Sequence, residues 1–220
     1  MTLRFGLRSL GLGFVTLVTA TSAASAQTPG RCEVRTRPGV SDVGCYLLDS
    51  VPIGHLPHDS VYWHLYEFPS LRAASQAREG KGTAFEAFDR FWLVTVAGQG
   101  WRPSPGTRIA VLGPIPVPAG RAYTARYLRS MLTPGFRTRI HQHAGAELFY
   151  VLHGAQCVET TAGHLITRSG ESATAPPGVL MQLSTYGLDT VRALVLVLHD
   201  SDKPWVDRSP VDWQPPGVCP

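Results

Sequence analysis

The feature that most constrains this chain is a short run of metal-ligand residues between Gly135 and Gly154. His141 and His143 are separated by one residue, and Glu147 follows after an Ala-Gly-Ala connection. On an extended strand, alternate side chains share one face, so the two imidazoles are expected to point the same way. If Ala-Gly-Ala makes a turn, the carboxylate returns on the neighbouring strand and faces the same space. Two imidazoles and one carboxylate form a facial set that binds a transition metal and leaves coordination positions open.

The same run resembles the first sequence motif of the cupin superfamily, G-x5-H-x-H-x3-4-E-x6-G. Gly135, His141, His143, Glu147 and Gly154 all stand at matching positions. The resemblance covers roughly residues 121 to 200. It implies a jelly-roll β-barrel and a metal held by the two histidines and the glutamate, and it leaves the reaction open.

The second cupin motif, G-x5-P-x-G-x2-H-x3-N, is matched only in part. Gly170, Pro176 and Gly178 are in place, but Met181 stands where the family has its fourth metal ligand, a histidine, and Thr185 replaces the asparagine. Two interpretations of Met181 stay open. A thioether is a soft ligand suited to Cu(I), whereas a buried methionine more often fills apolar space. Loss of metal binding altogether is a further alternative.

Other residues can belong to the same site. His64 shares a strand face with Tyr62 and Tyr66, so it is a candidate for the missing ligand if that face lines the barrel mouth. The alternative is a histidine that only packs in a sheet. By strand parity, Phe149 and Val151 face inward with Glu147 and give the pocket apolar walls, as small-molecule sites usually have.

Short alternating and β-branched segments dominate the mature chain and predict an all-β fold with one short helix. Residues 27–60 are rich in Pro, Gly and His and predict loops around one strand near 43–48. The helix is expected at 70–79, where Ser70 can cap it and Gly80 can end it. The remaining expected strands are 61–68, 90–97, 108–112, 115–117, 122–131, 137–143, 147–152, 157–161, 164–168, 172–175, 179–185 and 192–199.

We therefore divide the chain into four parts. Residues 1–26 are expected to be a signal peptide, 27–120 an N-terminal β-rich extension packed on the barrel, 121–200 the cupin barrel core, and 201–220 a Pro-rich C-terminal tail. A second, degenerate cupin within 40–120 is an alternative, although no His-x-His pair supports it.

The beginning of the chain predicts export. Arg4 and Arg8 precede an apolar stretch from Leu10 to Ala20, and Ala-Ser-Ala precedes Gln27, which is the pattern of a cleaved secretory signal. A membrane anchor is the alternative, but the apolar run is short for a bilayer. We expect a secreted or periplasmic bacterial protein without membrane attachment after cleavage.

Four cysteines follow in the mature part, an even number that suggests two disulfides in an exported protein. Three pairings exist. We prefer Cys32–Cys45, which closes a short loop, and this leaves Cys157–Cys219 to hold the tail on the barrel. The rival interpretation makes Cys157 a buried free thiol.

Charge and composition limit the partners. The net charge of +4 falls to +2 when Arg4 and Arg8 leave with the signal, and the arginines form no basic stripe, so nucleic acid is not expected as a partner. The resemblance implies a small-molecule ligand and a divalent transition metal, namely Fe, Mn, Ni, Cu or Zn. It makes a metal-dependent dioxygenase, decarboxylase or isomerase the first hypothesis. A non-catalytic periplasmic small-molecule or metal binding protein with a vestigial site is the alternative. By analogy with cupins that pair through sheet edges, a homodimer is included among the expected assemblies.

Overall fold

The computed structural model describes residues 43–57, 59–78 and 80–219. The expected signal peptide and Cys32 lie outside these described residues. The elements in chain order are β1 (Gly44–His55), β2 (Ser60–Phe68), α1 (Leu71–Ala77), β3 (Thr83–Ala87), β4 (Arg90–Ala97), β5 (Thr107–Pro116), β6 (Ala122–Leu132), β7 (Gly145–His153), β8 (Ala155–Thr160), β9 (Gly163–Arg168), β10 (Ser172–Ala175), β11 (Met181–Thr185) and β12 (Val191–Asp200).

The C-terminal part is an eight-stranded jelly roll. One sheet has the order β1-β6-β12-β7-β10, and the facing sheet has the order β11-β8-β9. Residues 137–143 extend the second sheet through two isolated bridges to β11, Arg137 with Ser184 and His141 with Met181. With this segment included, the strands from β6 to β12 form two four-stranded sheets in jelly-roll order, β6-β12-β7-β10 facing residues 137–143, β11, β8 and β9, and β1 adds to the edge of the first sheet. The expected all-β jelly roll is confirmed.

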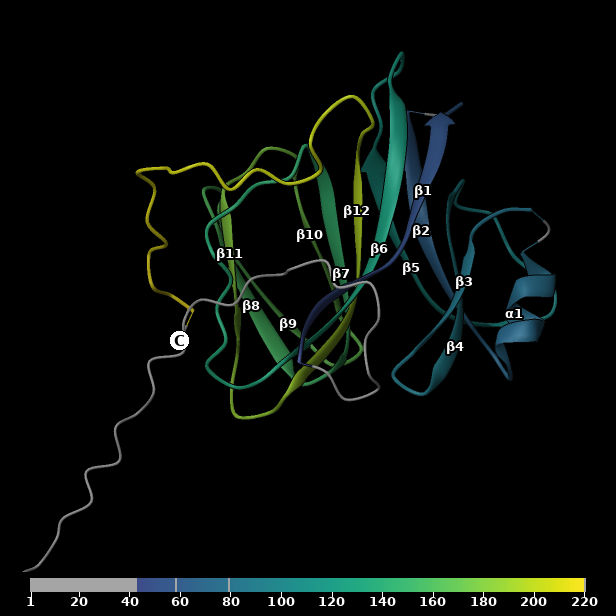
Figure 1. Cartoon of the computed structure of the whole chain (residues 1–220), viewed down its shortest axis with the longest axis horizontal. Helices are drawn as coiled ribbons and strands as arrows, with labels where there is room; N and C mark the ends of the chain where they lie inside the picture. Colours follow the sequence, from purple (N-terminus) through teal and green to yellow (C-terminus); the bar gives the residue numbers. More distant parts are fainter. Residues whose placement is uncertain (1–42, 58, 79, 220) are drawn as a thin grey trace, which may run out of the picture.

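The remaining strands form a third layer. β3-β4-β2-β5 make a separate antiparallel sheet that packs on the outer face of the β6, β12 and β7 layer. Helix α1 covers the far face of this sheet through Ala74 and Ala77, which pack on Tyr66 and Leu93. Figure 1 shows the resulting order, with α1 at one end of the molecule and β8, β9 and β11 at the other.

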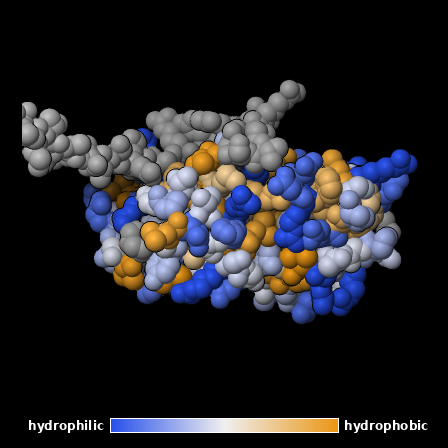
Figure 2. Space-filling model, turned by 90° about the horizontal axis from the view of Figure 1, so that it is seen from below, coloured by the Kyte–Doolittle hydropathy of each residue, from blue (hydrophilic) through white to orange (hydrophobic). Residues whose placement is uncertain are grey.

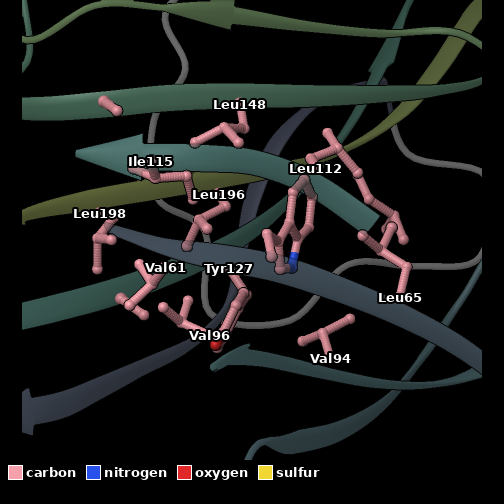
Figure 3. Packing of buried hydrophobic residues seen from close by; sticks show 14 of the residues in the cluster. Val61, Leu65, Val94, Val96, Leu112, Ile115, Tyr127, Leu148, Leu196 and Leu198 are labelled. Atoms are coloured by element: carbon pink, nitrogen blue, oxygen red, sulfur yellow. The ribbon is translucent and has the colours of Figure 1, made fainter. Parts of the chain in front are cut away.

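The central layer explains the most apolar segment of the sequence. β12 is nearly continuous in apolar residues because it is buried on both faces. Val195 and Val197 point into the barrel, whereas Leu196 and Leu198 pack against the third layer. Figure 3 shows these two leucines beside Val61 and other residues of that layer.

Several strands differ from the sequence prediction. β1 runs to His55, well beyond the expected end near residue 48, and passes through Pro52. Proline is tolerated there because β1 is the outermost strand of its sheet. β3 was not expected, and 107–116 is one strand rather than two. Residues 137–143 pair through isolated bridges, two to β11 and one from Gln142 to Asp207, rather than as a continuous strand.

The surface mixes residue types. Hydrophilic and hydrophobic residues are interspersed over the face seen in Figure 2. The large hydrophobic side chains that stay exposed in the described chain come from separate places along it: Val43, Leu71, Leu165, Leu188 and Val218. Within the described residues, no helix is long and apolar enough to cross a membrane.

Candidate metal centre

Glu147 is held at the inner face of the barrel by strands on both sides of it. It lies in β7 opposite Val197 of β12 and Ala175 of β10. β7 starts at Gly145, where a Cβ atom would lie 1.8 Å from the carbonyl oxygen of Leu198. Only glycine permits this approach. The small Ala-Gly-Ala connection therefore lets β7 begin directly against β12, two residues after His143.

The structure brings His141, His143 and Glu147 together. One ligand atom from each lies within 4.8 Å of the others, a spacing that can hold a metal ion. Nε2 of His143 is 3.4 Å from Oε2 of Glu147, and the two imidazole rings are 5.0 Å apart and almost perpendicular. His143 and Glu147 are buried. The local pattern recognised in the sequence is thus one cluster in space.

The hydrogen bonds of the two histidines leave the same nitrogen available on each ring. Nδ1 of His141 donates to the carbonyl oxygen of Arg139 (2.8 Å), and Nδ1 of His143 donates to that of Trp205 (2.7 Å). A carbonyl oxygen can only accept, so in the neutral ring Nδ1 carries the proton and Nε2 keeps a lone pair. This is how metal-binding histidines are usually oriented.

Two atoms at the centre of the cluster lack hydrogen-bond partners among the described residues. They are Nε2 of His143 and Oε2 of Glu147, and both are buried. Buried polar atoms are normally satisfied, so an exception requires an explanation. A metal ion between these atoms would provide it, and the donor set of two imidazoles and one carboxylate suits a transition metal.

Burial and charge interactions together shift the pKa values of all three residues in the cluster. Burial lowers the pKa of His141 below its usual value. Burial alone would also lower the pKa of His143, but the charge of Glu147 and its contact with Nε2 raise it above the usual value. Burial alone would raise the pKa of Glu147, but the neighbouring imidazoles, His143 first, lower it. Without metal, these shifts favour a protonated His143 beside an ionised Glu147.

We expect this proton to compete with metal. As the pH is lowered, the affinity for Zn²⁺ should already decline at a pH above the ordinary imidazole pKa of about 6.5, because the pKa of His143 is raised. For one displaced proton the decline is about tenfold per pH unit. The decline in affinity should become steeper at still lower pH, where His141, whose pKa is lowered, also takes up a proton. Competition with a chromophoric chelator between pH 5 and 8.5 measures this profile. A flat profile would contradict binding through these imidazoles.

The two residues proposed for a fourth coordination position differ in location. Met181 is directly opposite His141, and two backbone hydrogen bonds join them. Its side chain is buried in the apolar cluster that includes Phe149 and Val197, which supports the space-filling interpretation. The structure does not bring His64 to the cluster. It lies in β2 of the third layer, where Nε2 contacts the carbonyl oxygen of Gly98 (3.0 Å) and the ring packs on Trp101.

An internal cavity of about 30 Å³ adjoins the cluster. His141, Glu147 and Phe149 line it, together with Leu183 and Val195. Val151 is buried further along β7, and it is not among the described residues that line this cavity. The cavity has room for roughly one or two water molecules, so any larger ligand must occupy other space.

The C-terminal tail contributes to the site in a way that the sequence did not indicate. Trp205 stacks on His143 with ring centroids 5.6 Å apart, and its backbone carbonyl oxygen accepts a hydrogen bond from Nδ1 of the same histidine. Asp207 pairs with Gln142 through two backbone hydrogen bonds (2.9 and 3.0 Å) and accepts from its side-chain amide. Residues some 60 positions apart therefore hold the two histidines in place. An aromatic residue in the tail was the only local signal for this contact.

A disulfide anchors the end of this tail. Cys157 of β8 is bonded to Cys219, as expected, and both are buried. Val218 donates its backbone N–H to Glu159 of the same strand (2.7 Å). Cys45 is disulfide-bonded as well. Its expected partner, Cys32, lies outside the described residues.

Comparisons with known proteins return similarity in structure alone. No family model matches the sequence, and no curated protein matches it. A cupin-like protein from Thermotoga maritima is 16% identical, with a TM-score of 0.34 over 39% of this chain and 63% of that one. An oxalate oxidase in complex with the substrate analogue glycolate is 17% identical, with a TM-score of 0.33 over 40% of this chain and 46% of that one.

A third similar structure is the DMSP lyase DddQ from Ruegeria pomeroyi. It is 19% identical, with a TM-score of 0.33 over 42% of this chain and 45% of that one. This chain thus spans less than two thirds of each of these three proteins. The jelly-roll assignment rests on the strand order of the chain itself.

Proposed function

We propose that this chain is an exported cupin-type protein that binds a divalent transition metal through His141, His143 and Glu147. The observation that carries the proposal is the pair of buried atoms Nε2 of His143 and Oε2 of Glu147, which lie 3.4 Å apart and form no hydrogen bond within the described residues. Both atoms can offer a lone pair to a cation, and the negative carboxylate offsets part of the charge of a metal ion. The orientation of both histidines through Nδ1 supports the same conclusion.

The proposed activity is metal-dependent conversion of a small molecule, of the dioxygenase, decarboxylase or isomerase type. A bound metal supplies Lewis-acid or redox chemistry at its open coordination positions. The residues of this chain fix the ligand nitrogens, provide apolar walls through Phe149 and Leu183, and keep bulk water away from the buried carboxylate. Non-catalytic capture of metal or of a small molecule remains the alternative use of the same site.

Elemental analysis of the mature protein, purified without chelators or a histidine tag, tests the metal. Near-stoichiometric metal is expected, and His141→Ala should abolish it. His164→Ala is the matched control, since His164 is exposed on β9 away from the cluster. Absence of metal from the wild-type protein, even after reloading at neutral pH, would refute the proposal. Stoichiometric metal without turnover of any candidate substrate would favour capture over catalysis.

Met181→His provides a second test of the same site. Directly opposed residues of an antiparallel pair have their side chains on one face, so a histidine at 181 would lie beside His141. We expect tighter metal binding, on the order of tenfold or more, since a third imidazole would complete a set of four protein donors. Isothermal titration with Zn²⁺ compares the two proteins. If neither protein binds metal, the metal hypotheses fail.

Export is the remaining part of the proposal. The Cys157–Cys219 disulfide supports it, because stable disulfides form in oxidising compartments. Mass spectrometry of the protein recovered from the bacterial periplasm should give a chain that begins at Gln27. A chain that retains residues 1–26 in the cytoplasm would contradict this prediction.

A further inference from the structure

A buried serine lines the internal cavity at the candidate metal centre. His141 and Glu147 are in the wall of this cavity, and so is Ser130 of β6. Ser130 is buried, and its Oγ forms no hydrogen bond within the described residues. A hydroxyl group can donate one hydrogen bond and accept two, and buried polar groups are normally satisfied. The hydroxyl of Ser130 is therefore available to a molecule in the cavity.

The strand register places Ser130 at the end of the cavity away from the metal centre. The residues two before and two after it on β6 belong to the apolar cluster of the barrel interior, so its side chain also points inward. Ser130 is paired with Ala193 of β12, which is itself paired with Val151 of β7. Val151 lies two inward-facing positions beyond Glu147 on the same strand. The cavity therefore runs along the inside of the barrel, from the candidate metal ligands to Ser130.

The other polar residues at this end of the cavity are already engaged. Oγ1 of Thr138 accepts a hydrogen bond from the backbone N–H of Leu183 (2.9 Å). Arg129 is part of the wall, but its guanidinium group lies over the rings of Tyr46 and Phe88, 4.9 and 5.5 Å from their centroids. A charged ligand group here would be buried without an opposite charge, which is costly. A neutral group that forms a hydrogen bond avoids this cost.

We infer that the cavity is the inner end of the ligand site and that Ser130 positions the ligand in it. The ligand is a slender molecule with a metal-binding group at one end and a neutral hydroxyl at the other, and this hydroxyl hydrogen-bonds to Ser130. The cavity of about 30 Å³ has room for roughly one or two water molecules, which limits the buried end to about the size of a hydroxymethyl group. The inference rests on the proposed function, because it names the ligand class of that site.

The carboxylates 4-hydroxybutyrate and pentanoate are suitable probes, because they have the same charge and nearly the same length but end in a hydroxyl and a methyl group. Calorimetric titration into Zn²⁺-loaded wild-type protein should show tighter binding of 4-hydroxybutyrate. Ser130→Ala should weaken its binding by roughly fivefold, the effect of one lost hydrogen bond, and should not weaken binding of pentanoate. Ser184→Ala is the matched control. Ser184 is also buried with an unpartnered hydroxyl, but it is not among the described residues that line the cavity.

The outcomes separate the role of Ser130 from that of the metal. A preference for 4-hydroxybutyrate that is lost in Ser130→Ala and kept in Ser184→Ala supports the inference. Equal binding of the two probes to the wild-type protein overturns it, as does a preference that persists in Ser130→Ala or is lost in both variants. Zinc content is measured on the same samples. Absence of zinc refutes the proposed metal site and the inference with it, whereas full zinc content without a preference overturns the inference alone.

Discussion

Replacing Glu147 with glutamine is expected to weaken binding of divalent metal by at least about 100-fold. Loss of a residue that hydrogen-bonds to a metal ligand already lowers metal affinity roughly 10- to 100-fold. This change goes further, because it removes the negative charge of a candidate ligand itself. Glutamine has nearly the same size, so the strand pairing of Glu147 with Val197 and Ala175 should persist. Zn²⁺ affinity by chelator competition at pH 7.5 measures the effect.

The matched control for this variant is Glu86→Gln, because Glu86 is an exposed carboxylate on β3 in the outer layer. It should bind metal like the wild-type protein. The glutamine at 147 should also reverse the upward shift in the pKa of His143, since that shift comes from the Glu147 charge and contact. Titration of the imidazole resonances by NMR in the metal-free proteins detects it. Wild-type metal affinity in the Glu147 variant would exclude the carboxylate as a ligand.

Removing the Cys157–Cys219 disulfide is expected to lower the free energy of unfolding by about 4 kcal/mol. The bond joins residues 62 positions apart, and closing a loop of this length removes a large share of the entropy of the unfolded chain. Guanidinium unfolding of Cys219→Ser, followed by intrinsic tryptophan fluorescence, measures the loss. The Cys157→Ser, Cys219→Ser double variant should lose no more than the single variant, because the same bond is removed once.

Cys219→Ser should also weaken metal binding by about tenfold, which is the usual effect of losing a residue that hydrogen-bonds to a metal ligand and orients it. The tail supports His143 through the carbonyl group and ring of Trp205, and its far end is held at Cys219. Asp207 still pairs with Gln142, so the loss should be partial. Full stability and full metal affinity in Cys219→Ser would show that the tail is held by its other contacts alone.

Much of the candidate site could be predicted because its signals are local. His141 and His143 share a face through the two-residue period of an extended chain, and Glu147 returns after a short connection that contains Gly145. Each of these relations spans only a few residues. The strands of the barrel were predicted for the same reason, since alternation and turn residues are properties of short segments.

The errors in the strand prediction also have local causes. Pro52 and its neighbours indicated a loop, but an outermost strand tolerates proline. β3 is only five residues long and lies in a stretch without strong β-branched content. His64 has the residue type and strand parity of a ligand, yet strand parity does not tell which of three sheets a strand joins.

By itself, the sequence determined the all-β class, the barrel motif and the three residues that cluster as candidate ligands, because these depend on periodicity and close spacing along the chain. Only the tertiary structure decided what surrounds them. The pairing of Asp207 with Gln142 and the contact of Trp205 with His143 both join residues some 60 positions apart. The burial of β12 between two sheets joins segments that are still further apart, since Leu196 packs in one cluster with Val61. These contacts form because sheets and a disulfide-anchored tail pack on one another, and no pattern within a short segment specifies that packing.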